Sequence, residues 1–262
     1  MDSAERDLLN ESLRKAMTAS SGRALDVALA ELGWADLLTE VPEFAIATTF
    51  RLFGETAAHA PLLNDVVLHA AGRTLGGTVP LPFAGGSWVV WERDDVDSSA
   101  LDPDLPLRTT EAPSGDPIPL AAGRRALGWW LLGSGQAMLD LARSHALDRE
   151  QFGRPIASFQ AVRHRLAETL VALEGAQAAL AAADDDLSSL LAKAAAGNAA
   201  LTAARHCQQV LGGIGFTAEH GLHRHVRRVL VLDGLLGSAR ELTREAGALL
   251  LSNGRTPRLI QL

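Results

Sequence analysis

The sequence predicts a mainly α-helical protein with N-terminal helices, a reduced β segment and a C-terminal antiparallel four-helix bundle. Three observations support this fold class. Between residues 120 and 251, Pro155 is the only proline, and Ala and Leu dominate. Apolar residues from Phe159 to Leu180 recur at three- and four-residue steps, as on one face of a helix. Strand-prone sequence is concentrated in the short run Trp-Val-Val-Trp at residues 88–91.

Residues 1–76 are expected to be helical, because apolar residues recur at helical spacing between Gly and Pro breakers. The stretches that carry this pattern are 24–32, 44–58 and 62–71. Residues 77–119 are the expected reduced β segment. Pro and Gly cluster around its start, the strand at 88–91 follows, and Asp, Pro and Ser predict loops with one or two short strands in the remainder.

Residues 120–252 are expected to form the four-helix bundle, because long helices with short connections pack antiparallel. One bundle helix should begin at the acidic run 184–186, since negative charge is favourable at a helix N-terminus. Gly212 and Gly213 can end that helix in left-handed geometry. Residues 253–262 are assigned to a tail.

Composition excludes several classes of protein. The chain has 262 residues and a formal net charge of -7, whereas nucleic-acid binding normally requires a basic face. Its one cysteine, Cys207, cannot form an intrachain disulfide and is expected to be a buried small apolar residue. No signal-peptide pattern is found, and no apolar run reaches the roughly 18 residues of a membrane span. We therefore expect a soluble, cytoplasmic protein without nucleic-acid or membrane partners.

A first motif lies between two expected bundle helices and reads Arg-Glu-Gln-Phe-Gly at residues 149–153, followed by Phe-Gln at 159–160. Arg149 can donate two parallel hydrogen bonds to a phosphate. Phe152 offers an apolar platform, and Gly153 allows close backbone approach. A simple interhelical turn, in which Arg149 pairs with a surface acid such as Glu150, is the alternative.

A second motif combines Gln209 with Gly212, Gly213 and Gly215. Glycines leave backbone N–H groups accessible to an anion, and the Gln209 amide can bond a nucleotide edge or ribose. The alternative is an ordinary helix C-cap. A helix rather than a strand precedes these glycines, so they do not form the strand-turn-helix dinucleotide fingerprint.

The two motifs together, at this spacing and followed by Phe216, Glu219, Arg224 and Arg227, resemble the C-terminal helical domain of the acyl-CoA dehydrogenases. The resemblance is strong over residues 120–252 and weak over 24–43. It implies FAD held mainly by a neighbouring subunit. The residues that it assigns to cofactor binding are Arg149, Phe152, Gln209, Gly212, Gly213 and Ser238, the last standing where the family has a threonine.

The resemblance also implies a carboxylate base opposite the flavin. The usual base position falls on Leu236, and the position used by some members falls near Gly123, so neither carries a carboxylate. Asp233 is the one candidate for a relocated base, although Asp before Gly is typical of a turn or cap. Two further acids, Glu241 and Glu245, are interpreted together with Arg240 and Arg244 as a solvated charge face.

Two departures from the family pattern shape the functional hypothesis. The β segment is much shorter than the family's β domain, and it carries no recognisable flavin-backing loop. We therefore expect a non-catalytic or half-site subunit of a hetero-oligomeric acyl-CoA dehydrogenase, pairing as α2β2 with a larger subunit that carries the base. The substrate would be an acyl-CoA, and the resemblance to the short subunit of heterotetrameric steroid-degrading acyl-CoA dehydrogenases makes a steroid-derived acyl group a candidate. The alternatives are a self-sufficient homo-oligomer that uses Asp233, and a flavin-free helical interaction subunit.

Three histidines crowd one region beside arginines: His220, His223 and His225. His-x-His spacing does not place two rings on one helix face, and no carboxylate completes a metal site, so no metal is expected. A basic helical surface that meets a nucleotide or a partner chain is the interpretation given to this region.

Overall fold

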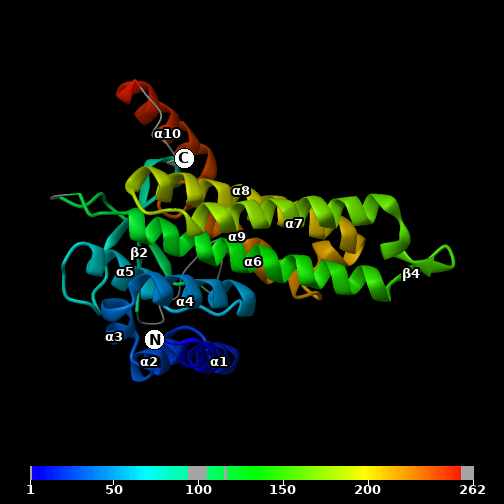
Figure 1. Cartoon of the computed structure of the whole chain (residues 1–262), viewed down its shortest axis with the longest axis horizontal. Coiled ribbons are helices and arrows are strands. Elements are labelled where there is room, and N and C mark those ends of the chain that lie inside the picture. Colours follow the sequence, from blue (N-terminus) through cyan, green and yellow to red (C-terminus); the bar gives the residue numbers. More distant parts are fainter. Residues whose placement is uncertain (1, 94–104, 115–116, 255–262) are drawn as a thin grey trace.

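The computed structural model describes residues 2–93, 105–114 and 117–254, so most of the expected tail at 253–262 lies outside the described residues. Figure 1 shows a long helical bundle that extends to one side of the molecule, with the N-terminal helices and a small sheet packed against its other end. No helix within the described ranges is long and apolar enough to span a membrane.

The N-terminal region is helical, as expected. Its elements are α1 (Ser3–Ala19), α2 (Arg23–Glu31), α3 (Trp34–Glu40), α4 (Pro42–Thr56) and α5 (Leu62–Ala70). Helices α2, α4 and α5 correspond to the three stretches identified in the sequence. Helix α1 was not singled out because it buries only Leu13 and Met17, and so carries a weak apolar pattern.

The β segment is a three-stranded antiparallel sheet in the order β1-β2-β3. Its strands are β1 (Pro80–Phe83), β2 (Ser87–Trp91) and β3 (Leu107–Thr110), and the turn η1 (Ala84–Gly86) joins the first two. Strand β2 confirms the expected strand. Strand β1 was missed because its two prolines suggest a loop, but an edge strand tolerates proline where the N–H would be unpaired.

The C-terminal region is a helical bundle, but its helices differ in length from the four long ones expected. Three are long, namely α6 (Ala121–Asp148), α7 (Gln160–Ala181) and α8 (Asp186–Leu211). Two shorter helices follow, α9 (Leu222–Gly234) and α10 (Ala239–Asn253), because the chain turns sharply between them. As expected, α8 begins at the acidic run, where Asp185 forms a capping box with Ser188.

The core between α4 and α6 is closed by direct backbone contact. A Cβ atom on Gly133 would lie 2.1 Å from the Arg51 carbonyl oxygen, and one on Gly54 would lie 2.4 Å from the Ser134 nitrogen. Fully buried aromatic rings fill the adjoining space, with Trp91 stacked on Trp130 at 5.6 Å. Aromatic side chains of this size bury large apolar areas, so the interface is densely filled.

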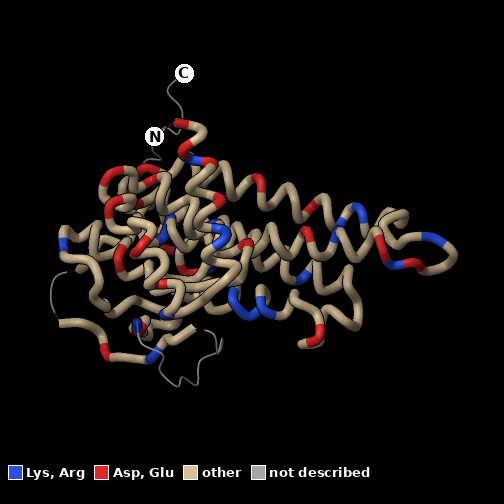
Figure 2. Tube along the Cα trace, turned by 90° about the horizontal axis from the view of Figure 1, so that it is seen from below, with Lys and Arg blue, Asp and Glu red and all other residues tan. Residues whose placement is uncertain are grey.

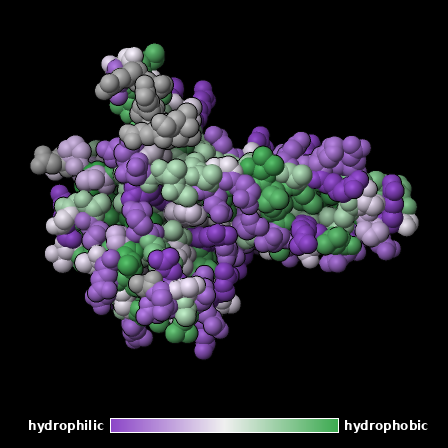
Figure 3. Space-filling model, in the orientation of Figure 1, coloured by the Kyte–Doolittle hydropathy of each residue, from purple (hydrophilic) through white to green (hydrophobic). Residues whose placement is uncertain are grey.

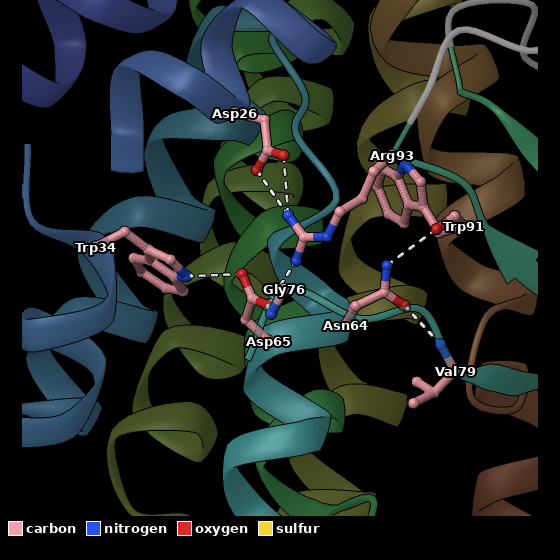
Figure 4. Close-up of polar contacts among 8 residues, drawn as sticks. All are labelled: Asp26, Trp34, Asn64, Asp65, Gly76, Val79, Trp91 and Arg93. Atoms are coloured by element: carbon pink, nitrogen blue, oxygen red, sulfur yellow. Dashed lines mark hydrogen bonds and ion pairs between the residues drawn. The ribbon is translucent and has the colours of Figure 1, made fainter. Parts of the chain in front are cut away.

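A buried polar network attaches the sheet to the N-terminal helices (Figure 4). Two residues after β2, the Arg93 guanidinium binds Asp26 of α2 at 2.9 Å and Asp65 of α5 at 2.5 Å. The indole of Trp34 also donates to Asp65, at 3.2 Å. Burial opposes the charge on Arg93, but the two carboxylates raise its pKa, so the guanidinium stays charged. The network is structural and fixes the residues that follow β2 against α2 and α5.

Candidate functional site

The first motif forms a hairpin that projects from the free end of the bundle (Figure 1). Arg149 ends α6, and β4 (Glu150–Gln151) pairs with β5 (Arg154–Pro155). The two turn residues, Phe152 and Gly153, both have positive φ, as a two-residue type I′ turn requires. The Phe152 side chain is 91% exposed. A large exposed aromatic residue in a left-handed conformation is unfavourable for an isolated chain, and this points to a contact with another molecule.

The second motif lies at the same end of the bundle. Gln209 is exposed in the last turn of α8, which ends at Leu211, and the helical turn η3 (Gly212–Phe216) follows. Gly212 has φ +64 but lies outside the expected left-handed helical region. An added Cβ on Gly212 or Gly213 would meet no atom within 4 Å, so this backbone is open to an approaching ligand.

The two motifs lie near each other at His145, in the last turn of α6. Burial lowers the pKa of His145, and its neighbours His220 and Arg149 lower it further. His220 belongs to the loop that follows η3, so this loop and the end of α6 are neighbours. In Figure 2, Lys and Arg alternate with Asp and Glu along the projecting hairpin. The structure thus brings the predicted residues of both motifs to one end of the bundle.

The two positions at which the sequence predicts the family's base, Leu236 and Gly123, meet inside the chain. Leu236 is 1% exposed and lies in the turn between α9 and α10 with φ +59. A Cβ on Gly123 would lie 2.8 Å from Leu236 Cδ1 and 3.0 Å from Val67 Cγ2. The Leu236 amide donates to the Pro82 carbonyl of β1 at 2.8 Å. This turn is therefore packed against the sheet and α5 by apolar contacts.

Lys193 of α8 is hydrogen-bonded to the backbone of the turn between α9 and α10. Its side chain is fully buried, and its Nζ donates to the carbonyl oxygens of Asp233 at 2.9 Å and Gly237 at 2.5 Å. Burial lowers the pKa of Lys193 to about 7, although the Asp233 charge acts in the opposite direction. The sequence pattern did not predict a role for Lys193. The one indication was that Lys193, one of only two lysines in the chain, lies on an otherwise Ala- and Leu-rich helix.

Replacing Lys193 is expected to remove a pH dependence of stability. The folded-state pKa lies below the unfolded value of about 10.4, so the unfolded chain binds more protons between these values. Burial of Lys193 therefore destabilises the fold fully below pH 7, and this penalty is relieved as the pH rises from 7 towards 10. We expect the melting temperature of wild type minus that of Lys193→Met to increase over this range. A constant difference would contradict the pKa assignment.

Asp233 and Ser238 have structural partners in the turn. The Asp233 carboxylate accepts a hydrogen bond from the Ala239 amide at 3.1 Å. Ser238 is the N-cap of α10 in a capping box, in which its hydroxyl accepts from the Glu241 amide at 3.4 Å and its amide donates to the Glu241 carboxylate at 2.9 Å. The hydroxyl also donates to that carboxylate at 2.7 Å. Such caps stabilise the first turn of a helix by about 1 kcal/mol.

Glu241, one of the acids interpreted as a solvated charge face, also makes a contact that the sequence did not predict. Its carboxylate accepts from the Gly85 amide at 2.9 Å, linking α10 to η1. The Gly85 bond, followed by the bonds from Ser238, lowers the pKa of Glu241 to about 2. Glu245 does lie on an exposed face, where it pairs with Arg124 at 3.3 Å.

The histidine region is less basic at the surface than expected. His225 and Arg228 are buried, because α9 packs both toward α4 and α6. The Arg228 guanidinium lies 5.7 Å from the Trp130 ring centre, and burial lowers the pKa of His225 to about 4. His225 also lines a cavity of about 740 Å³ whose walls include Arg51 of α4 and Asp140 of α6. Arg224 remains exposed, so only part of this set can face a partner.

Comparison with known proteins defines the class. Residues 119–246 match the family model "Acyl-CoA dehydrogenase, C-terminal domain". Acyl-CoA dehydrogenase IpdE2 from Mycobacterium tuberculosis is 30% identical over 227 residues, which cover 78% of this chain and 71% of that protein. The chain therefore belongs to the acyl-CoA dehydrogenase family. Acyl-CoA dehydrogenase FadE34 from the same organism is 39% identical over 71% of this chain, but the match spans only 29% of FadE34.

Solved structures confirm the fold over nearly the whole chain. A chain of a Tcur3481-Tcur3483 steroid ACAD variant superposes with a TM-score of 0.74 at 19% identity, covering 96% of this chain and 99% of that one. A chain of the ChsE4-ChsE5 complex from Mycobacterium tuberculosis gives a TM-score of 0.65 at 19% identity, covering 98% and 99%. At this identity the likeness establishes the fold.

Proposed function

We propose that this chain is a supporting subunit of a hetero-oligomeric, FAD-dependent acyl-CoA dehydrogenase, which lends cofactor contacts to a site held mainly by a larger partner. The observation that carries the proposal is the projecting hairpin, with Phe152 91% exposed at its tip. A group bound there would lie outside the chain's own core. It would be shared with another subunit.

The residues present fit a flavin dinucleotide approached from outside. Arg149 suits a diphosphate, because its planar guanidinium bonds phosphate oxygens in pairs. Gln209 offers both a donor and an acceptor to a nucleotide, and the open backbone at Gly212 and Gly213 admits close approach. Ser238, by contrast, is engaged as a helix cap and would have to share its hydroxyl. When bound, FAD supplies the hydride acceptor for α,β-dehydrogenation of an acyl thioester.

We further propose that the partner provides the base. Leu236 and Gly123 carry no proton acceptor, and Leu236 is buried, so substrate would not reach this position in the fold described here. Asp233 accepts a backbone hydrogen bond within the turn, which favours the capping role over that of a relocated base. The self-sufficient homo-oligomer is therefore a less favoured interpretation than the supporting subunit.

The partner and substrate are proposed from the neighbouring structures. Two of them are described as the ChsE4-ChsE5 complex and as a steroid ACAD. By analogy, we propose an α2β2 assembly with a larger dehydrogenase subunit and an acyl-CoA substrate with a bulky, steroid-derived acyl group. The remaining alternative, a flavin-free helical interaction subunit, predicts the same fold but no role for Arg149 in cofactor binding.

Co-expression with a larger dehydrogenase subunit that carries a carboxylate base tests the proposal. Arg149→Gln is expected to weaken FAD binding by the complex by about tenfold, because one charge-assisted pair of hydrogen bonds is lost. Flavin content per assembly and FAD affinity are the measurements. Arg143→Gln, an exposed arginine earlier on α6, is the matched control and should leave both unchanged. Unchanged flavin content in Arg149→Gln would favour the interaction subunit, and a yellow, active chain without any partner would favour the homo-oligomer.

A further inference from the structure

A closed chain of hydrogen bonds fixes an arginine on the surface of α7. Arg165 Nη1 lies 3.2 Å from His206 Nε2, and His206 Nδ1 lies 2.9 Å from Thr169 Oγ1. The Thr169 hydroxyl in turn donates to the Arg165 carbonyl oxygen at 2.8 Å. These contacts cross from α7 to α8 and return to the residue from which they start.

The direction of each bond follows from the number of protons available. Thr169 has one hydroxyl proton, which goes to the Arg165 carbonyl, so His206 Nδ1 must donate to Thr169. In a neutral imidazole Nε2 is then the acceptor, and the guanidinium of Arg165 donates to it. Burial, followed by the charge of Arg165, lowers the pKa of His206, which agrees with the neutral ring. The imidazole therefore works as an orienting acceptor for Arg165.

The arginine is held rigid at one end and open at the other. Thr169 is fully buried, whereas the Arg165 side chain is 48% exposed. One N–H is directed to His206 and a distant ion pair of 4.0 Å reaches Glu168, so the guanidinium has further donors for a ligand. A long surface side chain normally loses rotamer freedom when it binds, and prior fixation removes much of that cost.

The surroundings indicate an anion as the ligand. Gln209 lies three residues after His206, on the next turn of the same face of α8. The charged groups that act on the His206 ring are Arg165, Arg205 and Glu168, with a net positive sign in a chain whose net charge is -7.

We propose that Arg165, oriented by His206 and Thr169, binds a phosphate group of a nucleotide beside Gln209. The inference rests on the proposed function only for the identity of the molecule that carries this phosphate group. The diphosphate of FAD and the diphosphate of coenzyme A present the same chemistry, and both are expected near a shared dehydrogenase site. In this arrangement Arg165 binds the ligand, whereas His206 and Thr169 are positioning residues.

Calorimetric titration of the full-length chain with inorganic pyrophosphate tests the proposal. Arg165→Gln is expected to weaken binding by about tenfold, while Arg163→Gln, the neighbouring exposed arginine, should change it less than twofold. Thr169→Val removes the hydroxyl that orients His206 and should weaken binding by about threefold. Bound anion should also raise the pKa of His206, followed by its imidazole proton resonance, and a purely structural triad would not show this shift.

Three outcomes would overturn the proposal: no pyrophosphate binding by wild type at millimolar concentration, equal losses in Arg165→Gln and Arg163→Gln, or an unmoved His206 resonance. Parallel titrations with FAD and coenzyme A identify the source, since only the true ligand should lose affinity in Arg165→Gln. The two proposals fail separately. Lost pyrophosphate affinity in Arg165→Gln, together with normal flavin content in Arg149→Gln complexes, would overturn the proposed function alone.

Discussion

Leu236→Glu is expected to destabilise the fold by more than about 3 kcal/mol and to restore no dehydrogenase activity to the chain. Leu236 is 1% exposed, and a Cβ on Gly123 would touch it, so a carboxylate at this position would be surrounded by apolar groups. Burying an unpaired carboxylate is strongly unfavourable, and the group would be protonated instead. Thermal or denaturant unfolding measures the loss, and an acyl-CoA turnover assay checks activity.

The pH dependence of Leu236→Glu gives a second readout. The folded-state pKa of the new glutamate should lie above its unfolded value of about 4.3, so the folded state binds more protons between these values. The variant should therefore be least destabilised near pH 4 and lose stability as the pH rises toward neutrality. Leu236→Met is the matched control and should cost less than about 1.5 kcal/mol. A stable Leu236→Glu protein that turns over acyl-CoA would show that this site is open in solution.

Gly133→Ala is expected to cost about 3 kcal/mol, through separation of α4 from α6. The added Cβ would lie 2.1 Å from the Arg51 carbonyl oxygen, and backbone atoms cannot move aside as a flexible side chain can. The helices would have to shift, which would loosen the buried contact between Phe53 and Trp130, whose ring centres lie 5.0 Å apart. For a chain of this size, such a loss lowers the melting temperature by on the order of 10 °C.

Gly175→Ala is the control for the Gly133 prediction. Gly175 also lies within a long helix, α7, but an added Cβ there would meet nothing within 4 Å. Alanine favours helix over glycine by about 1 kcal/mol, so this variant should be slightly more stable than wild type. Equal changes in melting temperature for Gly133→Ala and Gly175→Ala would contradict this prediction, because they would show that α4 and α6 can move apart at little cost in stability.

Much of the fold could be predicted because local pattern and tertiary packing agree. The acidic run before α8 predicted its N-terminus, and the structure places the cap at Asp185. The strand-prone run at residues 88–91 predicted β2. Strand β1 escaped prediction because its prolines suit a loop equally well, and only pairing with β2 decides between the two. The lengths of α9 and α10 likewise depend on the turn at Leu236 and Gly237, which the helical pattern does not encode.

The candidate site divides in the same way. Arg149, Phe152, Gln209 and the glycines were recognisable from motif spacing, and their assignment to FAD remains a prediction. The polar partners of the turn were not recognisable. The hydrogen bond between the Gly85 amide and Glu241 joins residues 156 positions apart. Lys193 binds carbonyl groups that are 40 and 44 positions away in the sequence. Such contacts depend on which helices become neighbours.

The sequence by itself determined the family, the helical architecture and the absence of a carboxylate at Leu236 and Gly123, because residue identity and periodicity are local properties of the chain. Tertiary structure alone decided that these two positions touch, that a buried lysine holds their turn, and that the two cofactor motifs lie at one end of the bundle. The physical reason is that burial, pKa and contact depend on side chains brought together from distant segments. The local pattern of residues does not show which distant segments become neighbours.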